Sequence, residues 1–287
     1  MYSKSITRSS RALFVVAIDQ STSMAGELEV AGRRVRKADL VAEVVNDLIA
    51  ELVECSRRAD GLRDYYDVAI VGYSGEGVTS LLDVEPWIPI KELNDRCIDE
   101  CDVVRQSCLE SGELHLFNYR MRRWILPKAT GSTPMYEALL RVCDIVSEWV
   151  SREECGDSFP PIIFNITDGE STDCDYLDIV EISNKIKSLS TSDGEALLFN
   201  IHIASELSCR SLLFPSLSQI AQWGDVPCAA LSLYTASSYM PPIFNEAVGE
   251  IKRCRVEGEQ LKAMSFNASV AEVVTILNIG SISVKRG

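Results

Sequence analysis

Residues 12–23 read ALFVVAIDQSTS, and this stretch decides the fold. Its first part, Ala12 to Ile18, is a continuous apolar run with the length of a strand. Such a run is typical of a central strand that is buried on both faces of a sheet. The run ends at Asp19, where oxygen-bearing side chains begin. The stretch therefore predicts a buried strand that delivers a polar loop to one edge of a sheet.

Strands alternate with amphipathic helices along the rest of the chain, which is the pattern of a parallel sheet covered on both faces. Further strands are predicted over Asp67–Tyr73, Ile162–Thr167, Ala196–Ile203 and Cys228–Tyr234, and a short antiparallel edge strand over Val78–Val84. Helices are predicted over Val35–Arg57, Met135–Val150, Tyr176–Leu189, Ser211–Trp223 and Ile243–Arg255. The predicted fold class is α/β, a doubly wound, Rossmann-like and mostly parallel sheet of about six strands with helices on both faces.

One domain is expected over residues 12–257, because no repeat, linker or shift of composition marks a second core. Residues 1–11 are predicted to be an N-terminal tail, and residues 258–287 a C-terminal helical extension that packs on the domain, with a helix over Val270–Leu277. The segment 85–128 interrupts the alternation. It is interpreted as an insertion close to the polar loops, with a helix over Ile90–Leu109.

Composition narrows the classes of partner. The 287 residues carry a formal net charge of −14, which disfavours nucleic acid or an anionic membrane as the main partner. No apolar run approaches the roughly 20 residues that cross a bilayer, and no signal peptide is recognised. A cytoplasmic location is expected, with reduced thiols for the ten cysteines.

The insertion contains a set of residues that could be considered zinc ligands. Cys97, Cys101 and Cys108 would share one face of the predicted helix, with His115 nearby. A straight helix separates Cys97 from Cys108 by roughly 16 Å, whereas thiolates that share a zinc ion lie about 2.3 Å from it. A buried stripe of thiols is therefore expected in place of zinc.

Three loops carry oxygen ligands. The first presents Asp19, Ser21 and Ser23 at alternate positions; the second, residues 130–135 (TGSTPM), presents Thr133; the third, residues 166–170 (ITDGE), presents Asp168. Each alone can be an ordinary turn or N-cap. Loops that follow parallel strands converge outside the carboxyl ends of those strands, and carboxylates with hydroxyls suit hard cations.

This set of residues resembles the metal-ion-dependent adhesion site of von Willebrand factor type A domains, and the likeness covers almost the whole chain. The resemblance implies five metal ligands, Asp19, Ser21, Ser23, Thr133 and Asp168. It implies Mg²⁺, with Mn²⁺ or Ca²⁺ as alternatives, and an open coordination position for an acidic side chain of a partner protein. Ser21 and Ser23 would contact the metal directly.

Two further expectations concern partners. Basic residues are dense in the insertion, so Arg120, Arg122, Arg123 and Lys128 are predicted to rim the site and attract an acidic ligand, although a solvated basic face is the simpler interpretation. The C-terminal residues are similar to the tails of bacterial stand-alone members of the family that resemble tellurite-resistance and stress-response proteins. Such proteins are often encoded beside kinases, phosphatases or ATPases, which suggests a stress-response or signalling role.

Two other functions stay open at this point, a Mg²⁺-dependent hydrolase or phosphatase and a passive scaffold with a vestigial metal site. Haloacid-dehalogenase-like phosphatases place a second carboxylate two residues after the first, and here that position is Ser21. The acid and nucleophile pair that such chemistry requires is therefore absent. His115 and His202 are expected to lie away from the motif loops. The sequence thus favours a binding module over an enzyme.

Overall fold

A computed structural model describes residues 2–30, 33–108, 114–203, 211–223, 227–252, 260–269 and 272–277. Within them an eight-stranded sheet has the order β15-β16-β14-β11-β1-β6-β7, with β8 paired to β6. Its strands are β1 (Ala12–Asp19), β6 (Tyr66–Ser74), β7 (Gly77–Ser80), β8 (Ile88–Pro89), β11 (Ile162–Thr167), β14 (Leu197–Ile203), β15 (Leu212–Leu213) and β16 (Met264–Ala268). The five central strands run parallel, and β7, β8 and β15 are antiparallel.

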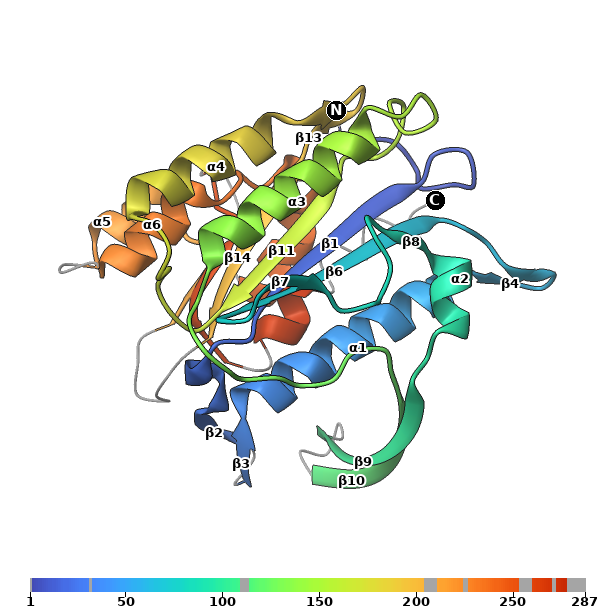
Figure 1. Cartoon of the computed structure of the whole chain (residues 1–287), viewed down its shortest axis with the longest axis horizontal. Coiled ribbons are helices and arrows are strands. Elements are labelled where there is room, and N and C mark those ends of the chain that lie inside the picture. Colours follow the sequence, from blue (N-terminus) through green and yellow to red (C-terminus); the bar gives the residue numbers. More distant parts are fainter. Residues whose placement is uncertain are drawn as a thin grey trace.

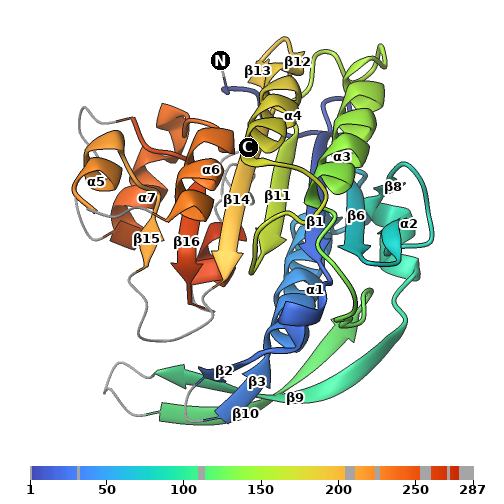
Figure 2. The same ribbon diagram turned by 60° about the vertical axis from the view of Figure 1, so that its left-hand side comes forward.

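Helices cover both faces of this sheet (Figures 1 and 2). They are α1 (Lys37–Cys55), α2 (Ile90–Asp95), α3 (Met135–Val150), α4 (Tyr176–Ser188), α5 (Leu217–Ala221), α6 (Cys228–Ala236) and α7 (Asn245–Lys252). The predicted fold class is confirmed, with more strands than expected and antiparallel strands at both edges. No described helix is both long and apolar enough to span a membrane.

The central strand separates two hydrophobic cores because its side chains alternate between the faces. Phe14, Val16 and Ile18 pack in the core that contains the apolar face of α1. Leu13, Val15 and Ala17 pack in the core that contains α3 and part of α4. Every residue of β1 is buried, as the unbroken apolar run predicted.

The prediction of a strand over Cys228–Tyr234 was wrong, because these residues form helix α6. This run is short and rich in Ala and Leu, which favour helix, and a short apolar run does not distinguish a strand from a buried helix. The sheet position beside β14 is filled by β16 instead. The segment 258–287, expected to be helical, thus supplies a strand of the sheet, and residues 272–277 form a helix after it.

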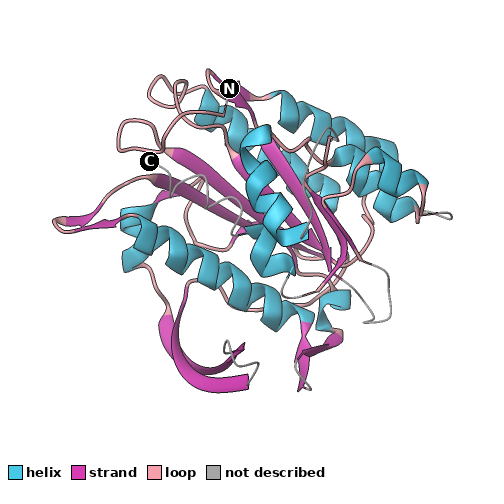
Figure 3. Ribbon diagram, turned by 180° about the vertical axis from the view of Figure 1, so that it is seen from behind, coloured by secondary structure: helices cyan, strands magenta, loops and turns pink. Residues whose placement is uncertain are grey.

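The prediction of a helix over Ile90–Leu109 was also wrong. Only α2 is helical there, and the chain continues as β9 (Asp99–Cys108) and β10 (Leu114–Arg123), an antiparallel pair of ten residues each. Apolar residues at alternate positions of β10, such as Tyr119 and Met121, are the period-2 signal of a strand. This pair, the β9–β10 arm, lies below α1 in Figure 1 and is not part of the central sheet (Figures 1 and 3).

Without a helix over Ile90–Leu109, the three cysteines do not share a helix face. Cys97 precedes β9 and Cys101 lies on it, and both are free and partly exposed rather than buried. The side chains of Cys108 and His115 lie outside the described residues. Among the described residues, no group of three or more His, Cys, Asp or Glu side chains could hold a metal ion.

Two other segments differ from the sequence prediction. A hairpin of β2 (Glu27–Val30) and β3 (Arg33–Arg36) separates the first polar loop from α1, which begins two residues later than predicted. The helix predicted over Ser211–Trp223 is replaced by β15 and the short α5. Pro215 lies between these two elements, where its ring disfavours a continuous helix.

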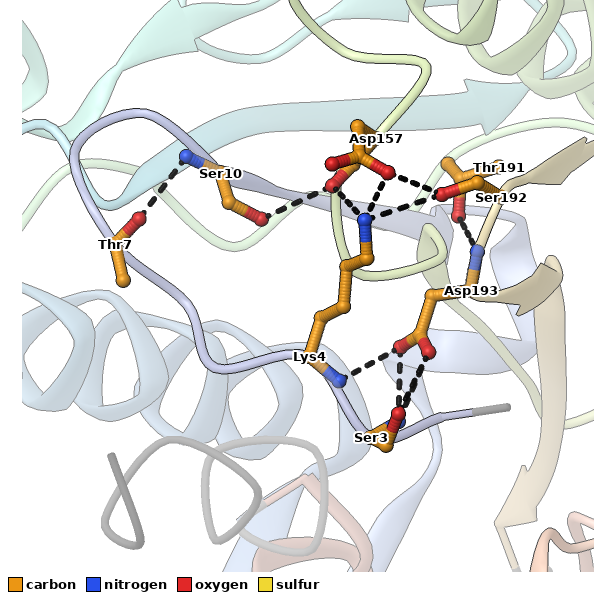
Figure 4. A network of polar contacts seen from close by, with 8 residues as sticks. All are labelled: Ser3, Lys4, Thr7, Ser10, Asp157, Thr191, Ser192 and Asp193. Atoms are coloured by element: carbon orange, nitrogen blue, oxygen red, sulfur yellow. Dashed lines mark hydrogen bonds and ion pairs between the residues drawn. The ribbon is translucent and has the colours of Figure 1, made fainter.

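The N-terminal segment is fixed to the domain by a buried carboxylate (Figure 4). Asp193 accepts hydrogen bonds from the Ser3 and Lys4 backbone N–H groups, each at 3.0 Å. The Lys4 ammonium pairs with Asp157. Asp193 lies just before β14, so this attachment is at the amino ends of the parallel strands.

A buried amide, that of Asn46 on α1, holds the chain that leaves the β9–β10 arm against the domain. The Asn46 Oδ1 accepts hydrogen bonds from the backbone N–H groups of Trp124 (2.8 Å) and Ile125 (3.1 Å), and its Nδ2 donates to the Ile125 carbonyl (3.0 Å). Trp124 is itself buried, and its indole N–H donates to the Leu93 carbonyl. The chain leaving β10 is therefore held against the middle of α1.

We expect Asn46→Leu to lower the free energy of unfolding by about 2–4 kcal/mol, because it leaves three buried backbone groups without partners. Urea denaturation followed by circular dichroism measures the change. Glu54→Ala on the same helix is the control, since it removes an exposed ion pair with Arg57 and an electrostatic interaction with Arg122 and should cost less than about 1 kcal/mol. Equal losses in the two variants would contradict the role given to Asn46.

Candidate functional site

The predicted site lies where the parallel strands end. In Figure 2, β11 and β14 point toward the lower edge of the sheet, where α1 begins. Asp19 is the last residue of β1 and is 1% exposed. Its Oδ1 accepts a hydrogen bond from the Ser21 N–H (2.8 Å), and its Oδ2 accepts one from the Thr167 hydroxyl (2.8 Å). The first and third loops therefore meet at Asp19.

A chain of hydroxyls continues from the first loop to Asp168. The Ser21 and Ser23 Oγ atoms lie 3.0 Å apart, and the Ser23 hydroxyl donates to Asp168 Oδ1 at 2.6 Å. The short 3-10 helix Thr22–Ala25 gives the loop this curl. Ser21, Ser23 and Asp168 are thus neighbours in space, as the sequence predicted, although 145 residues separate the last two.

The second loop is tied to the first through the backbone. The Thr22 N–H donates to the Gly131 carbonyl (3.0 Å), and the Thr130 N–H donates to the Gln20 carbonyl (2.7 Å). Thr133 is buried, and its backbone N–H donates to the Thr172 hydroxyl while its carbonyl accepts from the Thr172 N–H, each at 3.0 Å. In the described residues the Thr133 hydroxyl forms no hydrogen bond to Asp19 or Asp168. Thr133 therefore lies in a loop that contacts the cluster without being bonded to its carboxylates.

Lys37 is part of this site and was missed by sequence reasoning. Its ammonium donates to Asp168 Oδ2 at 2.7 Å, and the two side chains are 5% and 0% exposed. Lys37 is the first residue of α1. A basic residue at the start of a helix usually reads as a solvated side chain, so nothing in the sequence pattern singled it out.

Burial changes the acidity of the groups around the cluster. It raises the pKa of Asp19, although hydrogen bonds from Ser21 and Thr167 favour the charged form and oppose the rise. It also raises the pKa of Tyr73 well above its ordinary value, and the nearby Asp19 carboxylate adds to this. Tyr73 is therefore a neutral hydrogen-bond donor below the cluster.

His202 lies next to this cluster, which corrects the expectation that it would be remote. Its strand position pairs with Thr167, and its ring stacks on Phe266 with 4.3 Å between the ring centroids. Burial lowers the pKa of His202 to about 4, although the Asp168 carboxylate opposes the change. His202 is thus neutral at physiological pH. The side chain of His115, by contrast, lies outside the described residues.

A ladder of buried amides crosses the sheet beneath the site. The Tyr73 hydroxyl donates to Asn165 Oδ1 (2.9 Å), and the Asn165 amide donates to Asn200 Oδ1 (3.0 Å). The Asn200 amide in turn donates to the Ser237 hydroxyl (3.0 Å). Tyr73 on β6 and Asn165 on β11 reach one another across β1, where Tyr73 pairs with Asp19 and Asn165 pairs with Ala17.

The oxygens of the cluster fit the demands of a small hard cation. Mg²⁺ binds oxygen at 2.0–2.1 Å with octahedral geometry, so neighbouring ligand oxygens lie about 2.9 Å apart. The Ser21–Ser23 and Ser23–Asp168 oxygen pairs are separated by 3.0 and 2.6 Å, close to that spacing. The donor set consists of carboxylates and hydroxyls, which suits Mg²⁺, Mn²⁺ or Ca²⁺. The residues present fit such an ion, with Lys37 as the departure.

The predicted basic rim divides into two groups. Arg120, Arg122 and Arg123 belong to the β9–β10 arm. Arg120 pairs with Glu100, and Arg123 pairs with Asp99. Arg122 donates to Asn94 and stacks over the Trp124 ring. Lys128 pairs with Glu76 at 2.8 Å and lines a small cavity together with Asp19 and Gln20. Lys128 is therefore the member of the set that the structure places at the motif loops.

No family model and no curated protein matches the chain. Among solved structures, a von Willebrand factor type A protein from Catenulispora acidiphila is similar, with 15% identity and a TM-score of 0.39. The match covers 68% of this chain and only 34% of that protein. An aerotolerance-related membrane protein from Bacteroides fragilis NCTC 9343 gives 13% identity and a TM-score of 0.34 over 67% of each chain. The SpRpn10 VWA domain gives 9% identity and a TM-score of 0.38 over 80% of this chain and 83% of that domain.

The close approach of two glycines makes the loop contacts testable. Gly131 has a φ of +72°, and a Cβ atom on it would lie 2.6 Å from the Gly75 Cα. We expect Gly131→Ala to lower the free energy of unfolding by about 2 kcal/mol or more, because both the backbone conformation and the contact become strained. Urea denaturation measures this.

Gly169→Ala is the matched control beside Asp168. A Cβ atom at Gly169 would meet nothing within 4 Å, so the change should stay within about 0.5 kcal/mol of the wild type. A Gly131→Ala variant as stable as the Gly169→Ala variant would show that the second loop does not need its close contact with Gly75.

Proposed function

We propose that this chain is a von Willebrand factor type A-like interaction module that uses a divalent cation to bind an acidic side chain of a partner protein. Asp19, Ser21, Ser23, Thr133 and Asp168 would hold the ion, with Mg²⁺ as the expected metal and Mn²⁺ or Ca²⁺ as alternatives. When bound, the ion would supply a coordination position that a partner's carboxylate can take.

The observation that carries this proposal is the continuous set of oxygens from Ser21 through Ser23 to Asp168, at 3.0 and 2.6 Å. Asp19 is anchored beside it by the Ser21 N–H and the Thr167 hydroxyl. These oxygens are pre-arranged by hydrogen bonds, so binding an ion would require little reorganisation of the loops. Pre-arranged ligands raise affinity because less ordering remains to be done on binding.

A binding role is favoured over catalysis by the chemistry of the same loop. The position two residues after Asp19 is a serine whose hydroxyl contacts Ser23, and a hydroxyl cannot serve there as a general acid at neutral pH. His202 is neutral and packed against Phe266. A phosphatase and a passive scaffold are the alternatives that the experiment below separates from the proposal.

The partner proposal extends to the basic residues and to the setting of the protein. Lys128 is the best placed to attract an acidic ligand, whereas Arg120, Arg122 and Arg123 would act only if the ligand also reached the β9–β10 arm. A stress-response or signalling role, with a kinase, phosphatase or ATPase as partner, rests on the C-terminal residues alone, whereas the proposed cytoplasmic location rests on the ten cysteines, whose thiols are expected to be reduced. Residues 260–269 and 272–277 of the C-terminal segment are described, and its other residues lie outside the described part of the chain.

Titration with Mg²⁺, Mn²⁺ and Ca²⁺ while following thermal unfolding tests the metal. A ligand that binds only the folded state stabilises it by about 2.7 kcal/mol at a concentration of 100 times its Kd, so the melting temperature should rise with metal. We expect the double variant Ser21→Ala with Ser23→Ala, and separately Asp19→Ala with Ser21→Ala, to abolish the rise.

Thr22→Ala is the matched control. Thr22 stands between the two serines in the sequence, its side chain is exposed, and it is not assigned to the ion. Its response to metal should equal that of the wild type. A wild type whose melting temperature does not change with any of the three ions up to tens of millimolar would favour the scaffold. Mg²⁺-dependent turnover of p-nitrophenyl phosphate would favour the phosphatase.

A further inference from the structure

The ion pair between Lys37 and Asp168 is buried, and this demands an explanation. The side chains are 5% and 0% exposed, and Nζ lies 2.7 Å from Oδ2. Removing an ammonium and a carboxylate from water is costly, and a buried pair offsets the cost only with good geometry and further hydrogen bonds. Ser23 supplies one such hydrogen bond to the other carboxylate oxygen.

The position of Lys37 in its helix adds to the cost. Lys37 is the first residue of the 19-residue helix α1, where the macrodipole places partial positive charge and disfavours a cation. The backbone there is fixed, because the Lys37 N–H donates to the Gly26 carbonyl at 2.9 Å. Gly26 lies beside the lysine side chain, since a Cβ atom at that position would be in ordinary van der Waals contact with Lys37 Cε, at 3.5 Å. The ammonium is therefore directed into the cluster despite the helix dipole.

Both oxygens of Asp168 are engaged in this arrangement, Oδ1 by Ser23 and Oδ2 by Lys37. The two partners differ in how they would respond to a metal ion. A serine hydroxyl has lone pairs and can turn its proton away to become a ligand itself. An ammonium has three donors, no lone pair and a positive charge, so it cannot share the site with a divalent ion at contact distance.

We propose that Lys37 is a tethered cation that competes with the divalent ion for Asp168 and so sets the metal concentration at which the site loads. This inference rests on the proposed function, and it names the residue that controls loading. Without metal, the ammonium neutralises a carboxylate for which the described residues show no other positive partner. With metal, Lys37 has to give up Oδ2, so part of the metal's binding free energy is used to displace it.

The test is a Mg²⁺ titration of the whole chain by isothermal calorimetry and by thermal unfolding, comparing the wild type with Lys37→Met. Methionine keeps an unbranched stem and removes the charge. We expect the apparent Kd for Mg²⁺ to fall at least about tenfold. The metal-free variant should melt at a lower temperature than the wild type, because Asp168 is then buried without its partner, and Mg²⁺ should restore the loss.

Three further variants make the result specific. Lys37→Arg keeps the charge and should bind Mg²⁺ no more tightly than the wild type. Lys262→Met removes another buried lysine, one that donates to the Ser237 carbonyl, and should leave the Kd for Mg²⁺ unchanged. The double variant Lys37→Met with Asp168→Asn should lose the tight binding, which places the ion at Asp168.

The outcomes separate this inference from the proposed function. Equal Kd values for the wild type and Lys37→Met would overturn the competition and leave the metal site standing. No binding by either protein would overturn the proposed function itself. Binding by the variant alone would support the competition and contradict a metal-dependent role of the wild type. If Lys37→Met does not fold even with Mg²⁺, Lys37→Gln, which keeps a neutral donor for Asp168, replaces it in the same comparison.

Discussion

The burial of two carboxylates at one edge of the sheet is the constraint on which the rest of this site depends. Asp19 and Asp168 are each nearly inaccessible to water, and burying a carboxylate is costly unless it is hydrogen-bonded or paired with a positive charge. Each carboxylate therefore needs compensating donors. Asp19 obtains them from an N–H group and a hydroxyl, and Asp168 from a hydroxyl and an ammonium. The three loops are drawn together by these needs as much as by apolar packing.

The interior beneath the site also contains buried polar groups that need hydrogen-bond partners. The carboxyl ends of β1, β6 and β11 bring polar side chains into a region with hydrophobic cores on both sides. The ladder from Tyr73 through Asn165 and Asn200 satisfies its donors and acceptors by pairing them across the sheet. A buried polar network whose members all have partners rigidifies its surroundings and favours one arrangement of them. The loops above therefore rest on a fixed base.

The parts of the fold that could be predicted from sequence are those with a long and uniform hydrophobic pattern, either a continuous apolar run or a helical repeat. The buried run of β1 and the amphipathic pattern of α3 located these elements closely, and the carboxyl ends of the neighbouring strands β1 and β11 brought Asp19 and Asp168 together as expected. The failures have physical causes. Helix α6 is a short apolar run in which strand and helix look alike, and β10 was obscured by the helical interpretation of the residues before it. Lys37 could not be found because its role comes from a residue 131 positions away.

The attachment of the N-terminal residues at Asp193 sets the orientation of anything joined to that end of the chain. Ser3 and Lys4 are held beside the start of β14, whereas Asp19 and Asp168 lie where the parallel strands finish. A fluorophore, affinity handle or surface linker attached at the N-terminus would therefore lie at the edge of the sheet opposite the carboxylates. Immobilisation through that end leaves the oxygen cluster turned toward the solution, which makes the chain well suited to binding measurements on a solid support.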